Sequence, residues 1–223
     1  MTISTTIQPA SADTFILNAT PTTNYGTNVL IAIGDATGSA SAAYRILAKF
    51  DLSTIPANAK ILTAELELNE YAAYDTAGVG SWTAAVYPCL RNWVEAEATW
   101  NQYSSGNNWT TAGASGAGDI STAVDGITLD GTAAAGFVKW NGSGLAALVQ
   151  AWVSGSANNY GVVIAAPSAE NKGVGPLAAN LFRSSDYGTS GDRPKLTITY
   201  ALGKALVDGA LVGGIPHVGG NVQ

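Results

Sequence analysis

The chain has 223 residues and a formal net charge of -6, with 12% charged and 47% hydrophobic residues. Its ten Lys and Arg residues are scattered singly, so the sequence offers no basic stripe for nucleic acid or for an anionic membrane surface. The hydrophobic share excludes a disordered chain, and the length is typical of one large domain with a sizeable core.

Short apolar runs separated by Gly, Pro, Asn and Ser predict a chain made mostly of β-strands. We expect strands at residues 13–19, 28–34, 44–52, 59–71, 82–90, 161–167 and 194–200. Within 59–71 an apolar face alternates with a polar face, as in an antiparallel strand with one face on the core. The apolar face is Leu62, Ala64, Leu66 and Leu68, and the polar face is Thr63, Glu65, Glu67 and Asn69. Regular strands with turn signals between them predict an all-β fold, an antiparallel β-sandwich or jelly roll.

One short helix is predicted near residues 144–153. The stripe at i, i+3, i+4 and i+7 consists of Leu145, Leu148, Val149 and Trp152. Ser143 is a candidate cap at the start and Gly155 a candidate end. The Gly/Ser/Ala/Thr-rich segment 104–136 is interpreted as long loops with weak strands.

The character of the chain changes after Tyr200, where "ALVDG" and "ALVGG" form a near-repeat. We therefore divide the chain into a sandwich domain, 1–200, and an extended Gly-rich apolar C-terminal arm, 201–223. An arm too short for its own core favours contact with its own sandwich or with a neighbouring subunit. The side chains expected to make this contact are Leu206, Val207, Leu211, Val212 and Ile215.

The N-terminal segment lacks the basic and apolar regions of a signal peptide, and no segment approaches the ~20 apolar residues of a membrane span. The single cysteine, Cys89, is interpreted as a buried, inert thiol, because the one histidine, His217, lies in the arm. One His and one Cys also exclude a zinc site built from these residues.

Eight motifs in order resemble one family. They are "NYG" (24–26), "ILAKFDLSTIP" (46–56), "AKILTAELEL" (59–68), "NWVEAEATWN" (92–101), "LVQAW" (148–152), "NYGVVI" (159–164), "FRSSD" (182–186) and "RPKLTITY" (193–200). Over residues 12–200 the chain resembles the DNRLRE module, a carbohydrate-binding-type β-sandwich of secreted polysaccharide-degrading and cell-surface proteins. The resemblance implies a jelly roll without catalytic residues of its own and with binding residues on variable loops. Lys49 stands where that pattern has an arginine, and residues 201–223 lie outside it.

The stretch "RNWVEAEATWNQY" (91–103) contains the best candidates for catalysis, Glu95 and Glu97. In an extended segment their side chains would lie ~7 Å apart on one face, near the separation of an inverting glycosidase pair. The alternative is a pair of solvated carboxylates. Because the sequence offers no third polar group to position a water, we expect no enzyme.

Trp109 and Trp140 lie among polar and Gly residues, so they are the candidate aromatics for stacking on sugar rings; the alternative is packing in the core. We assign no cofactor. A structural Ca²⁺ ion would be compatible with Asp13, Asp51, Asp119 and Asp186 near predicted strand ends, but no EF-hand spacing is present and no ligand set follows from the sequence.

These observations favour a non-catalytic structural or adhesion module of a large assembly, namely a decoration, cement or tail-associated protein of a phage virion. Such a protein would contact capsid or tail subunits and form a homo-oligomer. The alternative is a carbohydrate-binding module of a secreted or cell-surface system that acts on polysaccharide. The expected location is the virion, the extracellular space or the cell surface.

Overall fold

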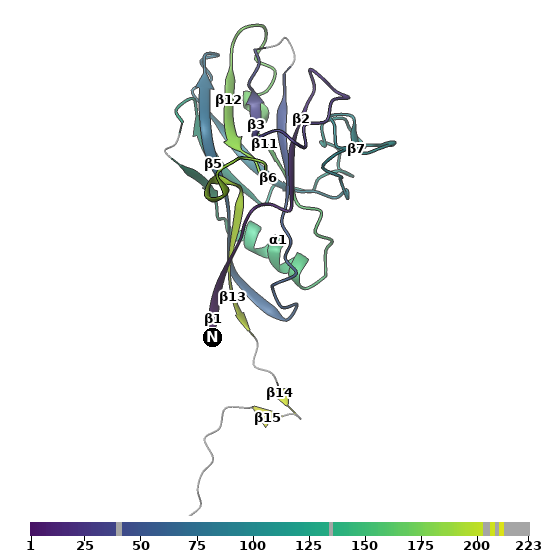
Figure 1. Ribbon diagram of the computed structural model, residues 1–223, viewed down its shortest axis with the longest axis vertical. Coiled ribbons are helices and arrows are strands. Elements are labelled where there is room, and N and C mark those ends of the chain that lie inside the picture. Colours follow the sequence, from purple (N-terminus) through teal and green to yellow (C-terminus); the bar gives the residue numbers. More distant parts are fainter. Residues whose placement is uncertain (39–41, 134–135, 203–205, 208–209, 212–223) are drawn as a thin grey trace, which may run out of the picture.

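The computed structural model describes residues 1–38, 42–133, 136–202, 206–207 and 210–211. These residues form an all-β protein with a single α-helix in the described part (Figure 1), which confirms the predicted sandwich class. The strands are β1 (Thr2–Ile7), β2 (Ala12–Leu17), β3 (Leu30–Asp35), β4 (Tyr44–Lys49), β5 (Ala59–Asp75), β6 (Ser81–Pro88), β7 (Gln102–Ser104), β8 (Asn107–Asn108), β9 (Asp125–Asp130), β10 (Phe137–Trp140), β11 (Val162–Ala165), β12 (Ala178–Arg183), β13 (Lys195–Leu202), β14 (Leu206–Val207) and β15 (Ala210–Leu211). The helix is α1 (Ser143–Val153), and two 3₁₀ turns are η1 (Pro167–Ala169) and η2 (Ser190–Asp192).

Eleven strands form one large curled antiparallel sheet. Its path runs β1-β13-β5-β12-β3-β4-β11-β6-β9, with β10 added to β5 and β2 added to β4. A single bridge, Gly34 to Tyr44, joins β3 to β4, so the sheet folds over at this point. The fold brings β6 against β10 and β12: the indole of Trp82 donates to the Asn180 side chain, and that of Trp140 donates to the Ala84 carbonyl.

The long strand β5 pairs with three other strands of this sheet. It pairs with β13 over its first part, with β12 over its last part, and with β10 on its other side. Ala64, Leu66 and Leu68 point into the core, as their alternation predicts. The prediction is wrong at Leu62, which is 44% exposed because the pairing with β13 shifts register beside it. Glu67 belongs to the polar face but is buried, because Lys139 and Lys195 on the flanking strands cover it at 3.2 and 3.3 Å.

Helix α1 is confirmed, and it packs against β5. Its buried side chains are Leu145, Val149 and Val153. The side chain of Gln150 fixes the helix, since it accepts from the Ile61 amide at 2.8 Å and donates to the Ala59 carbonyl at 3.1 Å. The predicted cap is wrong: Gly142 occupies the cap position without a side-chain bond, and Ser143 is already helical.

A second, smaller core lies on the other face of β2, β4 and β11. It contains Ile16, Leu47, Cys89, Trp93, Ala98, Trp109, Ala114 and Val163. Residues 89–114 thus fold back over the sheet, although much of this segment is polar in sequence. This layer covers a face that a simple two-layer sandwich would leave to solvent.

The C-terminal arm is described only in part. Strands β14 and β15 pair with each other, Leu206 opposite Leu211 and Val207 opposite Ala210. The side chains of Leu206, Val207 and Leu211, and all of Val212 and Ile215, lie outside the described residues, so the expected contact of the arm stays a prediction. Within the described ranges, no helix is long and apolar enough to cross a membrane.

Candidate functional site

Glu95 and Glu97 do not form a carboxylate pair across a cleft. The expected extended geometry is wrong, because the amides of Glu97 and Ala98 both donate to the Val94 carbonyl and close a turn. The turn sends the two side chains to different partners. Glu95 Oε1 accepts from the Asp13 amide at 2.7 Å, and Glu97 Oε2 accepts from the Ser105 amide at 2.8 Å.

Trp109 and Trp140 are buried, with 4% and 0% of their surface exposed. The expectation that they stack on sugar rings is therefore wrong, because stacking requires an exposed ring face. Trp109 packs in the smaller core and donates to the Thr99 carbonyl at 2.9 Å; Trp140 closes the main core. In "FVKW", the alternation of Val138 and Trp140 with their neighbours indicates that Trp140 faces the core. The polar neighbours of Trp109 give no such indication of its burial.

A polar pocket of about 300 Å³ opens beside Trp109, and we call it the amide pocket. Its lining residues are Thr22, Thr99, Asn101, Gln102, Asn108, Trp109 and Ala112. The Asn101 amide donates to the Pro21 carbonyl at 3.1 Å, so the two sides of the pocket are joined through the backbone. All of its lining residues are uncharged.

The side-chain amides of Asn101, Gln102 and Asn108 are free in the described part of the chain, where no protein donor or acceptor contacts them. Each amide carries an acceptor oxygen and two N–H donors. Three such groups around one hollow can bind a ligand that both donates and accepts hydrogen bonds. Sequence reasoning missed these residues because single Asn and Gln residues in a polar segment are indistinguishable from ordinary loop residues.

A second polar feature, the acidic cluster, consists of Asp13, Glu95 and Asp186. Asp13 is 1% exposed; its Oδ2 accepts from the Ser185 amide at 2.8 Å, and its Oδ1 has no hydrogen-bond partner. Burial raises the pKa of Asp13 to about 7, and the charges of Glu95 and Asp186 add to this rise. Burial also raises the pKa of Glu95, again with a contribution from Asp186.

The other aspartates considered for Ca²⁺ are accounted for differently. Asp119 is wrapped by the amides of Thr110, Thr111 and Gly116 and by the Arg91 guanidinium. Asp51 accepts from the Ser53 amide in an exposed turn. Across the residues that the structure describes, no three His, Cys, Asp or Glu side chains gather closely enough to hold a metal ion together.

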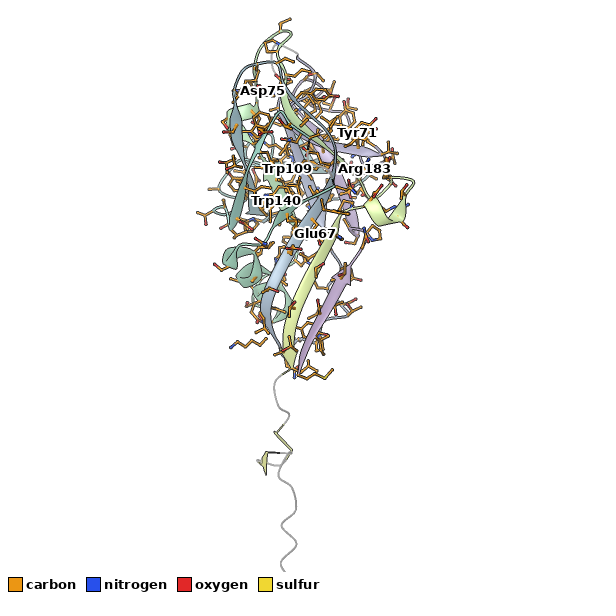
Figure 2. All side chains as sticks on the ribbon, turned by 90° about the vertical axis from the view of Figure 1, so that its left-hand side faces the viewer. Glu67, Tyr71, Asp75, Trp109, Trp140 and Arg183 are labelled. Carbon is orange, nitrogen blue, oxygen red and sulfur yellow. The ribbon has the colours of Figure 1, made fainter. Side chains whose placement is uncertain are left out.

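The outer face around β5 and β12 carries aromatic and cationic side chains. Arg183 lies over the rings of Tyr71 and Tyr187, at 5.5 and 5.0 Å, and Figure 2 shows Tyr71 and Arg183 together on this side of the sandwich. The guanidinium also donates to the Asn69 side chain and the Glu70 carbonyl. Because these contacts occupy Arg183, we interpret this face as a structural surface.

Cys89 is buried, and burial raises the pKa of its thiol to about 11. A thiol of this kind is protonated at neutral pH and is a poor nucleophile. His217 lies outside the described residues.

One family model matches the chain. It is described as the disaggregatase related repeat domain and covers residues 13–198. No curated protein shows significant similarity to the sequence. The resemblance to the DNRLRE module is therefore wrong: its motifs are alternating strands and turn residues that many sandwiches share, so they specified the fold correctly and the family incorrectly. The chain belongs to the disaggregatase related repeat domain family.

Proposed function

We propose that this protein is a non-catalytic binding module that holds a neutral, hydroxyl-rich polymer, a glycan chain, in the amide pocket. The observation that carries the proposal is the set of three free side-chain amides, on Asn101, Gln102 and Asn108, around one hollow. A sugar hydroxyl donates one hydrogen bond and accepts others, so it complements a carboxamide, which does the same.

Because the residues that line the amide pocket are uncharged, we expect an uncharged ligand. A polyanion would need Lys or Arg in the pocket, and none of the lining residues is basic. A volume of about 300 Å³ is at the lower end of the range for small-molecule sites, so we expect the pocket to take a single sugar unit or a chain end.

Two further observations support a binding role without catalysis. The pocket lining contains no carboxylate, and Glu95 and Glu97 are each bound to a different backbone amide. The family description names a repeat domain related to a disaggregatase and names no ligand. A repeat domain recurs within longer chains, and several weak pockets in one chain would gain avidity.

Affinity-gel electrophoresis with neutral and acidic polysaccharides tests this proposal. Asn101→Ala, Gln102→Ala and Asn108→Ala should each weaken binding to a neutral polysaccharide by roughly 3–10-fold, the value of one hydrogen bond. Asn158→Ala is the matched control, because Asn158 is exposed and lies outside the pocket lining. The proposal fails if no neutral glycan binds, or if the three pocket variants bind as the control does.

An assembly role, as a subunit of a virion or another large particle, is our second proposal. The observation that favours it is β1, which pairs with β13 on one side and has no partner strand on the other within the described residues. Its sequence, TISTTI, contains neither charge nor proline, the usual protections of an open edge. A strand from a neighbour can add to such an edge.

Solution mass tests the second proposal. A homo-oligomer of the full chain that dissociates when Ser4→Lys introduces a charge on β1, or when the chain is cut after Leu202, would support it. A monomer at all concentrations would contradict it.

A further inference from the structure

Among the described residues, the Asp13 carboxylate differs from the other fully buried aspartates. Asp35 and Asp119, both 0% exposed, have each of their oxygens occupied by N–H donors. Asp13 receives one amide, from Ser185, and its Oδ1 is buried without a partner. A buried polar atom without a partner costs about 1–3 kcal/mol in general, so a native protein seldom leaves one without a reason.

Three parts of the chain are fixed around Asp13. The Asn24 side chain donates to the carbonyls of Glu95 and Ala98, at 2.6 and 2.8 Å, and joins the 24–28 turn to the 94–98 turn. The Ser184 hydroxyl donates to the Asn28 carbonyl at 2.6 Å and joins the β12–β13 loop to the same turn. These bonds hold the surroundings of the carboxylates in place.

Gly26 shows how closely these turns approach. A Cβ at this position would lie 2.5 Å from the Glu95 carbonyl oxygen, so only glycine allows the contact. The approach places the backbone of the 24–28 turn directly against Glu95.

The charge of the cluster is not balanced by an ion pair. The charges of Glu95 and Asp186 raise the pKa of Asp13, and the charge of Asp186 raises that of Glu95. Among the described residues no Lys, Arg or His forms an ion pair with any of the three. Buried carboxylates in proteins are normally paired with a cation or coordinate a metal. A cation at Asp13 would satisfy Oδ1 and offset the charge of the cluster.

We propose that Asp13, through Oδ1, and Glu95 bind one Ca²⁺ ion, and that Asp186 contributes long-range negative charge. Two carboxylates neutralise the ion, which agrees with the lack of a group of three close ligating side chains in the described chain. Backbone carbonyls and water complete the shell, because Ca²⁺ accepts six to eight oxygens in irregular geometry whereas Mg²⁺ demands an octahedron. Because all the ligands are oxygen atoms, the site does not favour softer metal ions.

The site has a consequence for the amide pocket, and this consequence rests on the proposed function. The ion would tie β2 to the 94–98 turn, which the Asn24 side chain joins to the 24–28 turn; the Pro21–Asn101 hydrogen bond joins the flanking segments at the pocket. Removal of Ca²⁺ should therefore weaken glycan binding. Binding of the ion alone is measured without any glycan, so failure of the site and failure of the proposed function are distinguishable.

The experiment uses the full chain after chelation. Tb³⁺ luminescence, with Ca²⁺ as competitor, should show one site per chain, and Ca²⁺ at a hundredfold excess over its Kd should raise Tm by about 5–10 °C. Asp13→Asn and Glu95→Gln should each weaken Ca²⁺ binding at least tenfold. Glu97→Gln, two residues along and exposed, is the matched control and should bind as the wild type does.

The two ligand variants, Asp13→Asn and Glu95→Gln, differ in how deeply the substituted side chain is buried. If Asp13→Asn fails to fold, Glu95→Gln decides, because Glu95 is only half-buried. The proposal is overturned if the wild type shows neither a Tb³⁺ signal nor a Ca²⁺-dependent rise in Tm, or if Glu95→Gln binds Ca²⁺ as tightly as Glu97→Gln.

Discussion

Asp119 and Asp13 are both shielded from solvent, with 0% and 1% of their surface exposed, yet their pKa values shift in opposite directions. Burial alone would raise the pKa of both carboxyl groups. At Asp119 the amides of Thr111 and Thr110 outweigh burial and hold the pKa below its usual value. At Asp13 the hydrogen bonds from the backbone and side chain of Ser185 do not offset burial, and the pKa rises to about 7.

The difference follows from the local structure that carries each carboxylate. Asp119 ends a loop whose own backbone is not used in a sheet, so the loop wraps its N–H groups around the side chain from three to nine residues away. Asp13 lies in β2, whose backbone pairs with β4. Its donors must come from distant segments, and they are supplied by one residue, Ser185. Asp13 also lies deeper among protein atoms than Asp119, so deeper burial and fewer N–H donors both raise its pKa relative to that of Asp119.

The largest expected effect is at Asp119. Asp119→Ala should destabilise the protein by about 3–5 kcal/mol, because three backbone amides and the Arg91 guanidinium lose their common acceptor. Urea denaturation measures the loss. Asp51→Asn, in an exposed turn, is the control and should leave the unfolding midpoint nearly unchanged; an equal loss in both variants would contradict the comparison.

The pH dependence of stability should separate the two carboxylates in the presence of a chelator. The folded-state pKa of Asp13, which faces Glu95 and Asp186, is raised, so its stabilisation is complete below pH 3.8 and is lost as the pH rises to about 7. The loss amounts to at most about 4 kcal/mol. The lowered pKa of Asp119 acts in the opposite sense: its stabilisation is present above pH 3.8 and is lost as the pH falls further.

Thermal unfolding from pH 3 to pH 8 measures this prediction. Asp13→Asn should flatten the dependence of Tm on pH between pH 4 and pH 7. The same variant should leave the decrease in Tm below pH 4 unchanged. A wild-type curve that rises steadily from pH 4 to pH 7, and that Asp13→Asn does not alter, would be the contrary result.

The smallest expected effect is at Arg91. Its side chain is about a third exposed and lies 3.3 Å from Asp119 Oδ1, so solvent screens the pair. Arg91→Gln should therefore cost less than about 1 kcal/mol, measured by urea denaturation, since the backbone amides hold Asp119 without it. A loss as large as that of Asp119→Ala would show that the ion pair, rather than the amides, stabilises the loop.

The sequence was sufficient for the fold class because local patterns specify it, although β1, β10 and β12 lie outside the predicted strand ranges. Alternation in β5 and β13 and the stripe of α1 are properties of adjacent residues, and they predicted these elements correctly. Turn residues and alternation are common to many families, which explains the incorrect family resemblance. Local pattern also misled at Ser143, where a good capping residue lies one position inside the helix.

The candidate sites could not be predicted because they depend on long-range packing. Glu95 reaches the Asp13 amide across 82 positions of sequence, and Ser185 reaches Asp13 across 172. The burial of Trp109 arises from a loop that folds back over β4 and β11, which nothing in "NNWTT" indicates. Asp13 was correctly placed near a strand end, but its orphaned oxygen appears only when the distant segments are in position.

A crystal structure of the protein soaked with Tb³⁺ tests most directly the claim that Asp13, unlike Asp119, requires a cation. We expect one anomalous peak at the acidic cluster, about 2.3–2.6 Å from Asp13 Oδ1 and from a Glu95 oxygen, and none at Asp119. Asp13 Oδ1 bonded to a water molecule or a protein donor, with no peak beside it, would contradict this claim.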